Sequence, residues 1–276
     1  MSNEGVRISA ICGLTTTQTV SFGSIVDRDA FRLRVLVLDH ASPGELGAYE
    51  RALLAARASW RVVRAHAGDP LPDWRAYDAI IGLGGPMGAD EDDALSWLGA
   101  EKRLISDAVG SGTPFWGVCL GAQLLAASLG ARIYRGRLPE VGVRPVLITP
   151  AGARDPVFGG LPHSIEAIEW HRDTFELPSG AVLLATSAGR YPNQAFRWGA
   201  AAYGVQFHLE MSPATARDWT RVPGYRATLR RVKEIKGRMP LTELDRRTPQ
   251  MHLLAEKLLA RWLRLTSGLR PRPRTA

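Results

Sequence analysis

Residues 114–129, PFWGVCLGAQLLAASL, join a short apolar run to a second apolar segment through a turn that contains two glycines. Pro114–Val118 has the length and composition of a buried β-strand, and Gly121–Leu129 has those of a helix. Cys119 therefore stands at a strand–turn–helix elbow, a position that nucleophiles occupy in several hydrolases. Glycine on each side of such a turn supplies the room and the dihedral freedom that a sharp bend requires.

The expected helix after Cys119 would favour a reactive cysteine in this turn. The partial positive charge at a helix N-terminus favours a thiolate, and the backbone N–H of Leu120 can donate to an oxyanion. The alternative interpretation is a small buried cysteine in an ordinary β–α turn. The pentapeptide Gly117–Gly121 alone leaves both interpretations open.

Strand-like and helix-like segments alternate through the first half of the chain. The pattern predicts strands at Leu33–Leu38, Trp60–Ala65 and Asp78–Leu83, and helices at Gly44–Ala58 and Trp97–Val109. Alternation of this kind predicts an α/β fold, with a mostly parallel open sheet flanked by helices.

The second half of the chain changes character, because its strand-like runs have no long helices between them. These runs are Val143–Thr149, Glu166–His171, Val182–Thr186, Gln194–Arg197 and Ala201–Phe207. They predict a small antiparallel extension of the sheet. Helices are expected from Pro213 to Arg221 and from Met251 to Leu265, with a frayed end after Gly268.

The chain is expected to have three parts. Residues 1–32 are rich in Ser and Thr, lack periodicity and are interpreted as a loose extension, with residues 33–222 as the main domain. Residues 223–276 are interpreted as a basic helical tail that packs on the domain or extends it. The segment 217–276 holds 16 Lys/Arg and 5 Asp/Glu, so it carries the basic surplus of a chain whose net charge is +8. That surplus fits either solvated helix faces or a docking surface for an acidic partner.

Cysteine content and hydropathy indicate the class of protein. Cys12 and Cys119 lie far apart in dissimilar surroundings, which argues against a disulfide framework and favours a reducing compartment. No apolar run approaches the ~20 residues that span a bilayer, and the N-terminus lacks the pattern of a secretory signal. A cytoplasmic protein without a membrane segment is expected.

A second chemical motif follows the last strand-like run. In Gly204–Glu210, GVQFHLE, His208 and Glu210 are two residues apart, so on a strand they share one face. A neutral imidazole can accept a thiol proton, and a carboxylate can fix its tautomer and stabilise the imidazolium. The alternative is a pair of exposed polar residues at a strand end. The order Cys, then His-x-Glu, favours the catalytic interpretation.

A glycine-rich loop, Gly84-Gly85-Pro86-Met87-Gly88, ends the third expected strand. Such a loop exposes backbone N–H groups, and that of Gly85 is a candidate second oxyanion donor beside that of Leu120. An ordinary glycine turn is the alternative, and only the position of the loop at the end of a strand supports its role as an oxyanion donor.

Five separated segments together resemble the class I glutamine amidotransferase family. They are Gly84–Gly88, Trp97–Ala126, Trp170–Ser187, Asn193–Phe196 and Tyr203–Glu210, in the order found in the family. The chain looks most similar to stand-alone members that resemble the glutaminase domain of GMP synthase. The resemblance covers roughly Leu33–Trp219 and implies the flavodoxin-like fold of that family.

The resemblance also implies roles for individual residues. Cys119 would be the nucleophile, His208 the base and acid, and Glu210 the orienting carboxylate. Gly85 and Leu120 would form the oxyanion hole. Gln123 would contact bound glutamine, and the segment from Trp170 through His171 and Arg172 to Asp173 would help bind its amino-acid head. Leu209 departs from the proline that the family usually has between His and Glu.

No metal and no cofactor are expected. The run His171-Arg172-Asp173 does not by itself make a ligand set, and no Cys/His cluster supports one. The chain also lacks the GxxxxGK[ST] phosphate loop and the SGGxDS-type loop of the synthetase half of GMP synthase. It is therefore expected to release ammonia without activating an acceptor.

Three functions remain open on the sequence. The first is a glutaminase that hydrolyses glutamine through a γ-glutamyl thioester on Cys119 and passes ammonia to a partner synthase. The second is a γ-glutamyl hydrolase or peptidase that uses the same three residues on a γ-glutamyl amide. The third is a non-catalytic binding or regulatory module, whose basic tail contacts a partner or nucleic acid, of which nucleic acid is not the expected one.

Overall fold

The computed structural model describes residues 33–41, 46–187, 189, 191–236 and 243–269, which belong to one compact unit of the chain. Cys12 and the rest of the expected extension 1–32 lie outside the described residues, as does the end after Leu269. The proposed division between residues 222 and 223 therefore falls within the described unit and stays a prediction.

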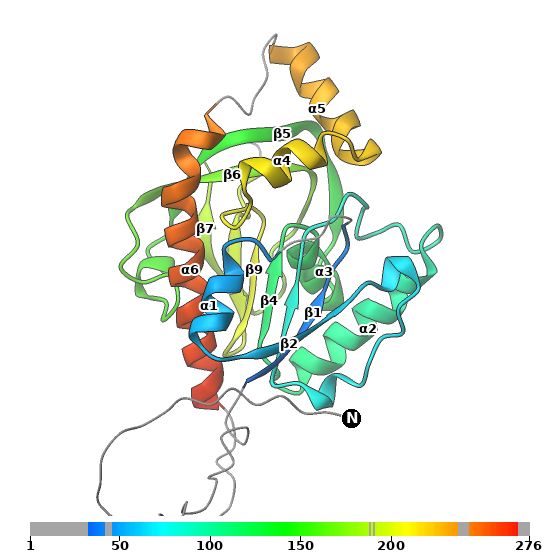
Figure 1. Cartoon of the computed structure of the whole chain (residues 1–276), viewed down its shortest axis with the longest axis vertical. Helices are drawn as coiled ribbons and strands as arrows, with labels where there is room; N and C mark the ends of the chain where they lie inside the picture. Colours follow the sequence, from blue (N-terminus) through cyan, green and yellow to red (C-terminus); the bar gives the residue numbers. More distant parts are fainter. Residues whose placement is uncertain (1–32, 42–45, 188, 190, 237–242, 270–276) are drawn as a thin grey trace, which may run out of the picture. The chain divides into compact units, whose positions relative to one another are not determined.

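The described strands form one nine-stranded sheet in the order β2-β1-β3-β4-β9-β8-β7-β5-β6 (Figure 1). The first five strands in this order are parallel, and the remaining neighbours pair antiparallel. This confirms the expected parallel sheet with an antiparallel extension. The strands are β1 Arg34–Leu38, β2 Ser59–Val63, β3 Ala79–Gly82, β4 Phe115–Val118, β5 Ile133–Ile148, β6 Ser164–Phe175, β7 Val182–Thr186, β8 Ala195–Trp198 and β9 Ala202–Val205.

Helices α1 Tyr49–Ala55 and α6 Leu244–Leu269 lie against one face of the parallel part of the sheet, and α2 Ser96–Gly110 and α3 Leu120–Ser128 lie against the other (Figure 1). Helices α4 Pro213–Trp219 and α5 Pro223–Lys236 lie beside β5 and β6, and short 3-10 helices are found at Ala65–Ala67, Trp74–Ala76 and Gly152–Arg154. Among the described residues, none of the helices combines the length and hydropathy that crossing a bilayer demands.

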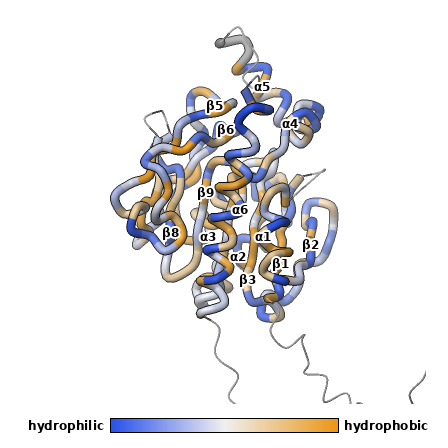
Figure 2. Tube along the Cα trace, turned by 60° about the vertical axis from the view of Figure 1, so that its left-hand side comes forward, coloured by the Kyte–Doolittle hydropathy of each residue, from blue (hydrophilic) through white to orange (hydrophobic). Residues whose placement is uncertain are grey.

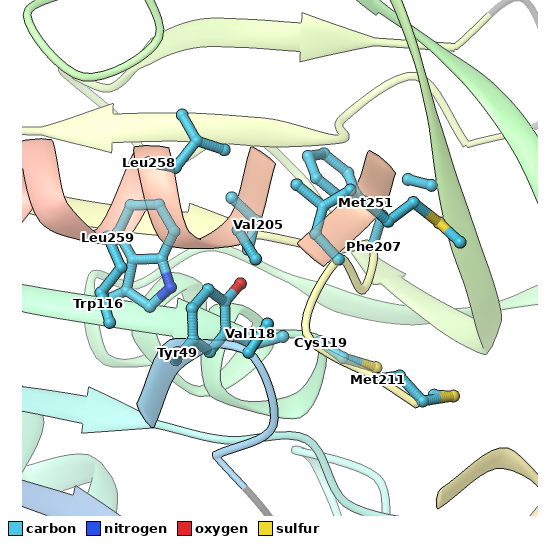
Figure 3. Packing of buried hydrophobic residues seen from close by; sticks show 14 of the residues in the cluster. Tyr49, Trp116, Val118, Cys119, Val205, Phe207, Met211, Met251, Leu258 and Leu259 are labelled. Carbon is cyan, nitrogen blue, oxygen red and sulfur yellow. The ribbon is translucent and has the colours of Figure 1, made fainter. Parts of the chain in front are cut away.

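Alternate side chains of the central strands point into two hydrophobic cores, one on each face of the sheet. Val35 and Val37 of β1 face the core that contains α1 and α6, whereas Leu36 and Leu38 face the core with α2 and α3. Strands buried on both faces read as unbroken apolar runs, and the trace of β1 is accordingly largely hydrophobic (Figure 2). Cys119 lies at the edge of the first core, near Val118 and Met211 (Figure 3).

The antiparallel extension is longer than its sequence pattern suggested. β5 begins at Ile133, ten residues before the predicted start, and β6 runs on to Phe175. The first part of β5 contains Gly136 and Pro139, which weaken a strand pattern. The ladder accommodates them because its register shifts between Arg135 and Glu140, a bulge of the kind that re-aims a strand.

Two helix predictions also differ from the structure. α1 begins at Tyr49 rather than Gly44, and α6 begins at Leu244 rather than Met251. The early turns of α6 carry the buried residues Leu244 and Thr248. Packing against the domain therefore stabilises this segment although Pro249 interrupts its helical pattern.

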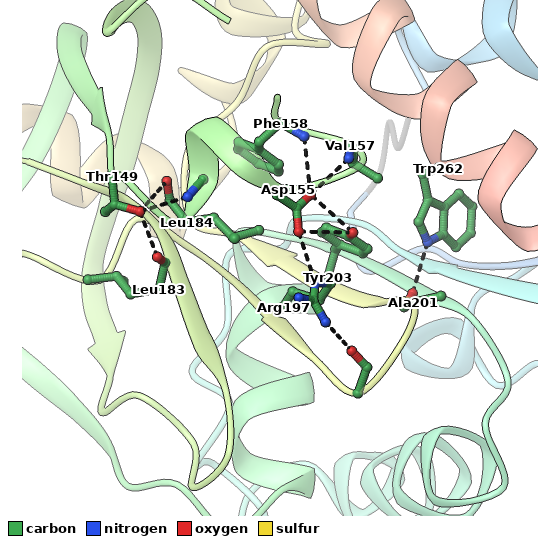
Figure 4. Close-up of polar contacts among 12 residues, drawn as sticks. Thr149, Asp155, Val157, Phe158, Leu183, Leu184, Arg197, Ala201, Tyr203 and Trp262 are labelled. Atoms are coloured by element: carbon green, nitrogen blue, oxygen red, sulfur yellow. Dashed lines mark hydrogen bonds and ion pairs between the residues drawn. The ribbon is translucent and has the colours of Figure 1, made fainter. Parts of the chain in front are cut away.

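The buried carboxylate of Asp155 connects several segments at the antiparallel part of the sheet. Asp155 accepts hydrogen bonds from the backbone N–H of Val157 (2.8 Å) and from the Arg197 side chain (2.9 Å), and the Tyr203 hydroxyl donates to it at 3.1 Å (Figure 4). Burial and the Asp155 charge raise the pKa of Tyr203. Because a buried charge is costly without partners, this carboxylate ties β8, β9 and the loop at Val157 together.

The last helix is part of the core and is not a loose appendage. Trp262 of α6 is fully buried, its ring centroid lies 6.0 Å from that of Trp116 in β4, and its indole N–H donates to the Ala201 carbonyl at 3.0 Å (Figure 4). We expect Trp262→Ala to lower the free energy of unfolding by about 3–5 kcal/mol, because it leaves a large cavity and removes one of the hydrogen bonds that the Ala201 carbonyl accepts.

Urea unfolding followed by circular dichroism measures this effect. Leu253→Ala in the same helix is the matched control, since Leu253 is 67% exposed and should change stability by less than about 0.5 kcal/mol. Equal effects of the two substitutions would show that α6 does not depend on this contact.

Candidate active site

Cys119 stands at the turn between β4 and α3, as the sequence predicted. Its backbone has φ 50° and ψ −103°, a conformation that is strained for any residue except glycine. The glycines around it are required by close packing. A Cβ on Gly121 would lie 2.1 Å from the Gly82 carbonyl oxygen, and one on Gly117 would lie 2.6 Å from the Gly121 oxygen. The turn therefore holds the side chain of residue 119 in one direction at the N-terminus of α3.

His208 and Glu210 lie just beyond β9 and not within it, so the expected strand to Phe207 is too long. His208 is held by a single antiparallel bridge to Ile168 of β6, with backbone hydrogen bonds of 2.8 and 3.0 Å. The predicted pairing nevertheless forms. His208 Nδ1 lies 2.6 Å from Glu210 Oε1, and Glu210 Oε2 accepts the Leu209 N–H at 3.0 Å. Both side chains are buried.

The pKa of His208 is raised to about 10. Burial alone would lower it, but the charge of Glu210 and the interactions with Cys119 and Glu210 outweigh burial. The imidazole therefore carries its proton at neutral pH, between a carboxylate on one side and the sulfur on the other.

Gly84 brings Cys119 and His208 together. A Cβ on Gly84 would lie 3.0 Å from His208 Cε1, 3.7 Å from its Nε2 and 3.6 Å from Cys119 Cβ. Both side chains thus press against the same glycine. Nε2 of His208 is buried and makes no hydrogen bond within the part of the chain that the structure describes. It is available to a proton donor or acceptor beside the sulfur.

The glycine loop lies where a second oxyanion donor is needed. A Cβ on Gly85 would lie 2.7 Å from the Leu120 side chain and 2.6 Å from His40 Cβ, so the two candidate donors, Gly85 and Leu120, are neighbours. His40 supports the loop from below. Its Nδ1 lies 2.9 Å from the Leu83 oxygen and its Nε2 lies 2.6 Å from Glu101 Oε1.

The buried His40–Glu101 pair was not predicted. Burial lowers the pKa of His40, but the charge and hydrogen bond of Glu101 raise it by more, so the net shift is upward. The imidazole can then donate from both nitrogens, to the carbonyl of Leu83 and to Glu101. His40 follows β1 directly in sequence, but Glu101 comes from α2, and no local spacing relates the two.

A cavity of about 400 Å³ opens over Cys119. Its lining includes Gly85 and all five residues predicted to bind substrate, which are Gln123, Trp170, His171, Arg172 and Asp173. Gln123 Nε2 donates to the Asp173 carbonyl at 3.0 Å, and Arg135 pairs with the Asp173 side chain at 3.0 Å. Arg172 Nε donates to the Gly136 carbonyl. Predicted residues from three separate segments, the glycine loop, the elbow and Trp170–Asp173, therefore line one cavity.

His171 also belongs to a buried acidic cluster behind the cavity. Its Nε2 lies 3.0 Å from Glu169 Oε2 and 3.8 Å from Glu140 Oε2, and its Nδ1 lies 3.0 Å from the Asp173 oxygen. Burial lowers the pKa of His171, but hydrogen bonding to and the charge of Glu169 raise it by more. We interpret the group as an ion pair between two residues of β6 that faces Glu140 of β5, although three such ligands within 4.8 Å have the composition of a metal site.

Gln206 was not predicted and contacts the sulfur. Its Nε2 lies 3.6 Å from Cys119 Sγ, and its Oε1 accepts a hydrogen bond from Gln123 at 3.2 Å. The side chain is fully buried. The period of two that relates Gln206 to His208 and Glu210 was the available sequence signal, since these residues alternate along the same segment.

Comparison with known proteins identifies relatives of this chain. The glutamine amidotransferase class-I family model matches residues 47–219, which is more than half of the chain. The glutamine amidotransferase-like protein YfeJ of Salmonella typhimurium is 33% identical over 158 residues, covering 56% of this chain and 65% of that protein. The chain thus spans just under two-thirds of that relative. A glutamine-hydrolysing GMP synthase subunit of Thermoplasma acidophilum is 32% identical, covering 55% of this chain and 76% of that protein.

Solved structures extend the likeness to the fold. A glutamine amidotransferase of Thermotoga maritima superposes with a TM-score of 0.73 at 32% identity, covering 84% of this chain and 98% of that one. A glutamine amidotransferase of Methylobacillus flagellatus gives 0.74 at 28% identity, covering 85% and 95%. From the matched motifs, the sheet order and these relatives, the chain belongs to the class I glutamine amidotransferase family.

Proposed function

We propose that this protein is a cysteine-dependent glutaminase, which hydrolyses the side-chain amide of glutamine and releases glutamate and ammonia. One observation carries the proposal. Cys119 and His208 press against the same glycine, Gly84, while His208 Nδ1 lies 2.6 Å from Glu210. Sulfur, imidazole and carboxylate thus follow one another in the order that nucleophilic catalysis requires.

In the proposed reaction, the thiolate of Cys119 attacks the δ-carbonyl carbon of glutamine. The backbone N–H groups of Gly85 and Leu120 stabilise the tetrahedral oxyanion. His208 gives its proton to the departing ammonia, which leaves a γ-glutamyl thioester on the sulfur. His208 then takes a proton from water, the hydroxide attacks the thioester, and glutamate leaves.

The cavity supports recognition of an α-amino acid. Arg135 and Arg172 supply positive charge on its wall, and Asp173 supplies negative charge. An amino acid presents one carboxylate and one ammonium group, which these side chains match. Gln123 is already anchored to the Asp173 carbonyl and to Gln206, so its side chain needs no rearrangement to meet substrate.

We also propose that the released ammonia passes to a partner synthase. Relatives whose names designate them as glutamine-hydrolysing GMP synthase subunits support this, because such a designation indicates that those proteins work with another chain.

A substrate screen tests the proposed function. Purified protein and Cys119→Ala are incubated with glutamine and with several γ-glutamyl amides, and ammonia and glutamate are both quantified. Equal release of ammonia and glutamate from glutamine by the native protein alone supports the proposal. Equal rates for the native protein and Cys119→Ala would refute it.

Gln206 is expected to raise the rate through its contact with the sulfur. A hydrogen bond to a charged group contributes about 1.5–3 kcal/mol, so Gln206→Leu should lower kcat about 10- to 100-fold. Leucine is close in size and leaves Gln123 bonded to the Asp173 carbonyl. Steady-state glutaminase assays give kcat, and an unchanged circular dichroism spectrum shows that the fold is kept. A kcat equal to that of the native protein would remove Gln206 from the mechanism.

A further inference from the structure

Helix α5 forms one wall of the cavity, although it lies beyond residue 219, where the family match ends. Gly224, Tyr225, Ala227, Thr228 and Arg231 line the cavity together with Cys119. The first turn of α5 rests on the glycine loop, since a Cβ on Gly224 would lie 3.1 Å from Pro86 Cβ. The site is therefore complete only with this helix in place.

Aromatic stacking fixes the ring of Tyr225 near His208. Tyr225 and Trp219 are stacked at 4.3 Å with 8° between their planes, and Trp219 meets the His208 ring edge-on at 5.1 Å. Trp170 packs edge-on against both, at 5.7 Å from Trp219 and 5.8 Å from Tyr225. Such pairs have preferred geometries, so the Tyr225 ring has little freedom to move aside.

The Tyr225 hydroxyl is buried and unused. Tyr225 is 4% exposed, and its hydroxyl oxygen has no hydrogen-bond partner among the described residues. A buried polar group without a partner costs about 1–3 kcal/mol. Burial and the nearby charges of Cys119 and Glu210 raise the pKa of Tyr225, so the hydroxyl stays protonated close to these groups. The hydroxyl can donate and accept a hydrogen bond, and a bound ligand can supply the partner that it lacks.

The leaving group must come close to His208. In the proposed reaction His208 Nε2 protonates the departing nitrogen, so this nitrogen has to lie within hydrogen-bond reach of Nε2. Trp170 and Tyr225 line the cavity, and Trp219 packs against both of them and against the His208 ring. Any substituent on the amide nitrogen would have to share this space with the Tyr225 ring.

We propose, on the basis of the proposed function, that Tyr225 is a specificity-determining residue that restricts the substrate to primary carboxamides. Its ring occupies the space that a substituent on the amide nitrogen would need. Its hydroxyl hydrogen-bonds to the unsubstituted –CONH2 group. The site thus favours glutamine over γ-glutamyl compounds in which the amide nitrogen carries carbon.

The test compares glutamine with γ-glutamyl methylamide, which differs by one methyl group on the reacting nitrogen. We expect the native protein to favour glutamine at least tenfold in kcat/KM. Tyr225→Phe keeps the stack on Trp219 and removes the hydroxyl, so it should lower kcat/KM for glutamine about 3- to 10-fold, the loss of one neutral hydrogen bond. Tyr225→Ala opens the wall and should reduce the preference for glutamine at least tenfold.

Two further measurements make the result decisive. Arg230→Ala is the matched control, because Arg230 is exposed on the same helix and should leave both substrates unaffected. Labelling of Cys119 by a glutamine-like diazoketone reports on the nucleophile in every variant. If all variants are labelled but the ratio of the two substrates stays the same, the assignment of Tyr225 is wrong and the proposed function stands. If the native protein is not labelled and hydrolyses neither substrate, the proposed function fails, and this proposal with it.

Discussion

Cys119→Ala is expected to abolish glutamine hydrolysis while the protein stays folded. Removing the nucleophile of a hydrolase lowers kcat by a factor on the order of 10⁶, because the γ-glutamyl thioester can no longer form. Alanine keeps the Cβ and removes only the sulfur, which lies at the edge of the first core, so the fold should be kept. Ammonia release from glutamine should therefore fall to the buffer rate.

The strain at residue 119 adds a stability test that activity alone does not provide. A non-glycine residue at φ 50° and ψ −103° costs about 1–3 kcal/mol. Cys119→Ala keeps that strain, whereas Cys119→Gly removes it. We expect the glycine variant to be the more stable of the two by about 1 kcal/mol, although glycine usually destabilises a folded chain relative to alanine.

Thermal unfolding of both variants, beside glutaminase assays, separates the two claims. A glycine variant clearly less stable than the alanine variant would mean that the turn is not strained. Residual turnover well above the buffer rate in both variants would mean that another group is the nucleophile. Either result would change the role given to the elbow.

The elbow and the His208–Glu210 pair of the candidate site could be predicted because each is encoded locally. Gly117 and Gly121 flank Cys119 in one turn, and His208 precedes Glu210 by two residues, so each motif is visible in the sequence, and the order of the two motifs favoured reading them together. The alternation of strands and helices before residue 129 likewise predicted the parallel sheet. In these segments the local pattern and the tertiary fold agree.

The remaining features depend on contacts that no local pattern contains. His40 meets Glu101 across 61 residues, and Tyr225 meets His208 only through Trp219. The sequence of α5 is basic and polar, and in the part whose burial the structure describes, residues 223–232, the buried residues are Tyr225, Leu229 and Val232. Its position over the cavity follows from stacking between its first turn and aromatic residues of α4 and β6, which composition does not predict.

Glu210→Gln is expected to lower kcat about 10³- to 10⁴-fold and to change how stability depends on pH. The carboxylate accepts from His208 Nδ1 at 2.6 Å. An amide can present N–H in its place and so favour the wrong imidazole tautomer, which costs about 10⁴-fold in the comparable serine hydrolase triad. The assay is steady-state glutaminase activity, and Glu50→Gln, an exposed residue of α1, is the control.

The pH effect follows from the direction of the His208 shift. Its pKa is about 10 in the folded chain and 6.5 in the ordinary state, so the folded state holds a proton that the unfolded state releases. This contribution to stability is fully present below about pH 6.5 and is lost as the pH rises through about 10, at up to about 1.4 kcal/mol per pH unit. In Glu210→Gln, only Cys119 opposes the lowering of the His208 pKa by burial, so this pKa falls. The dependence of the unfolding free energy on pH then becomes weaker.

The difference in unfolding free energy between the native protein and Glu210→Gln should therefore shrink between pH 6.5 and 10. Urea unfolding at pH 6.5, 8 and 9.5 measures it, and Glu50→Gln should keep a constant difference from the native protein over the same range. A constant difference for Glu210→Gln as well would mean that Glu210 does not hold the proton on His208. The imidazole would then start the reaction neutral, and it would have to take its proton from the thiol before the attack on glutamine.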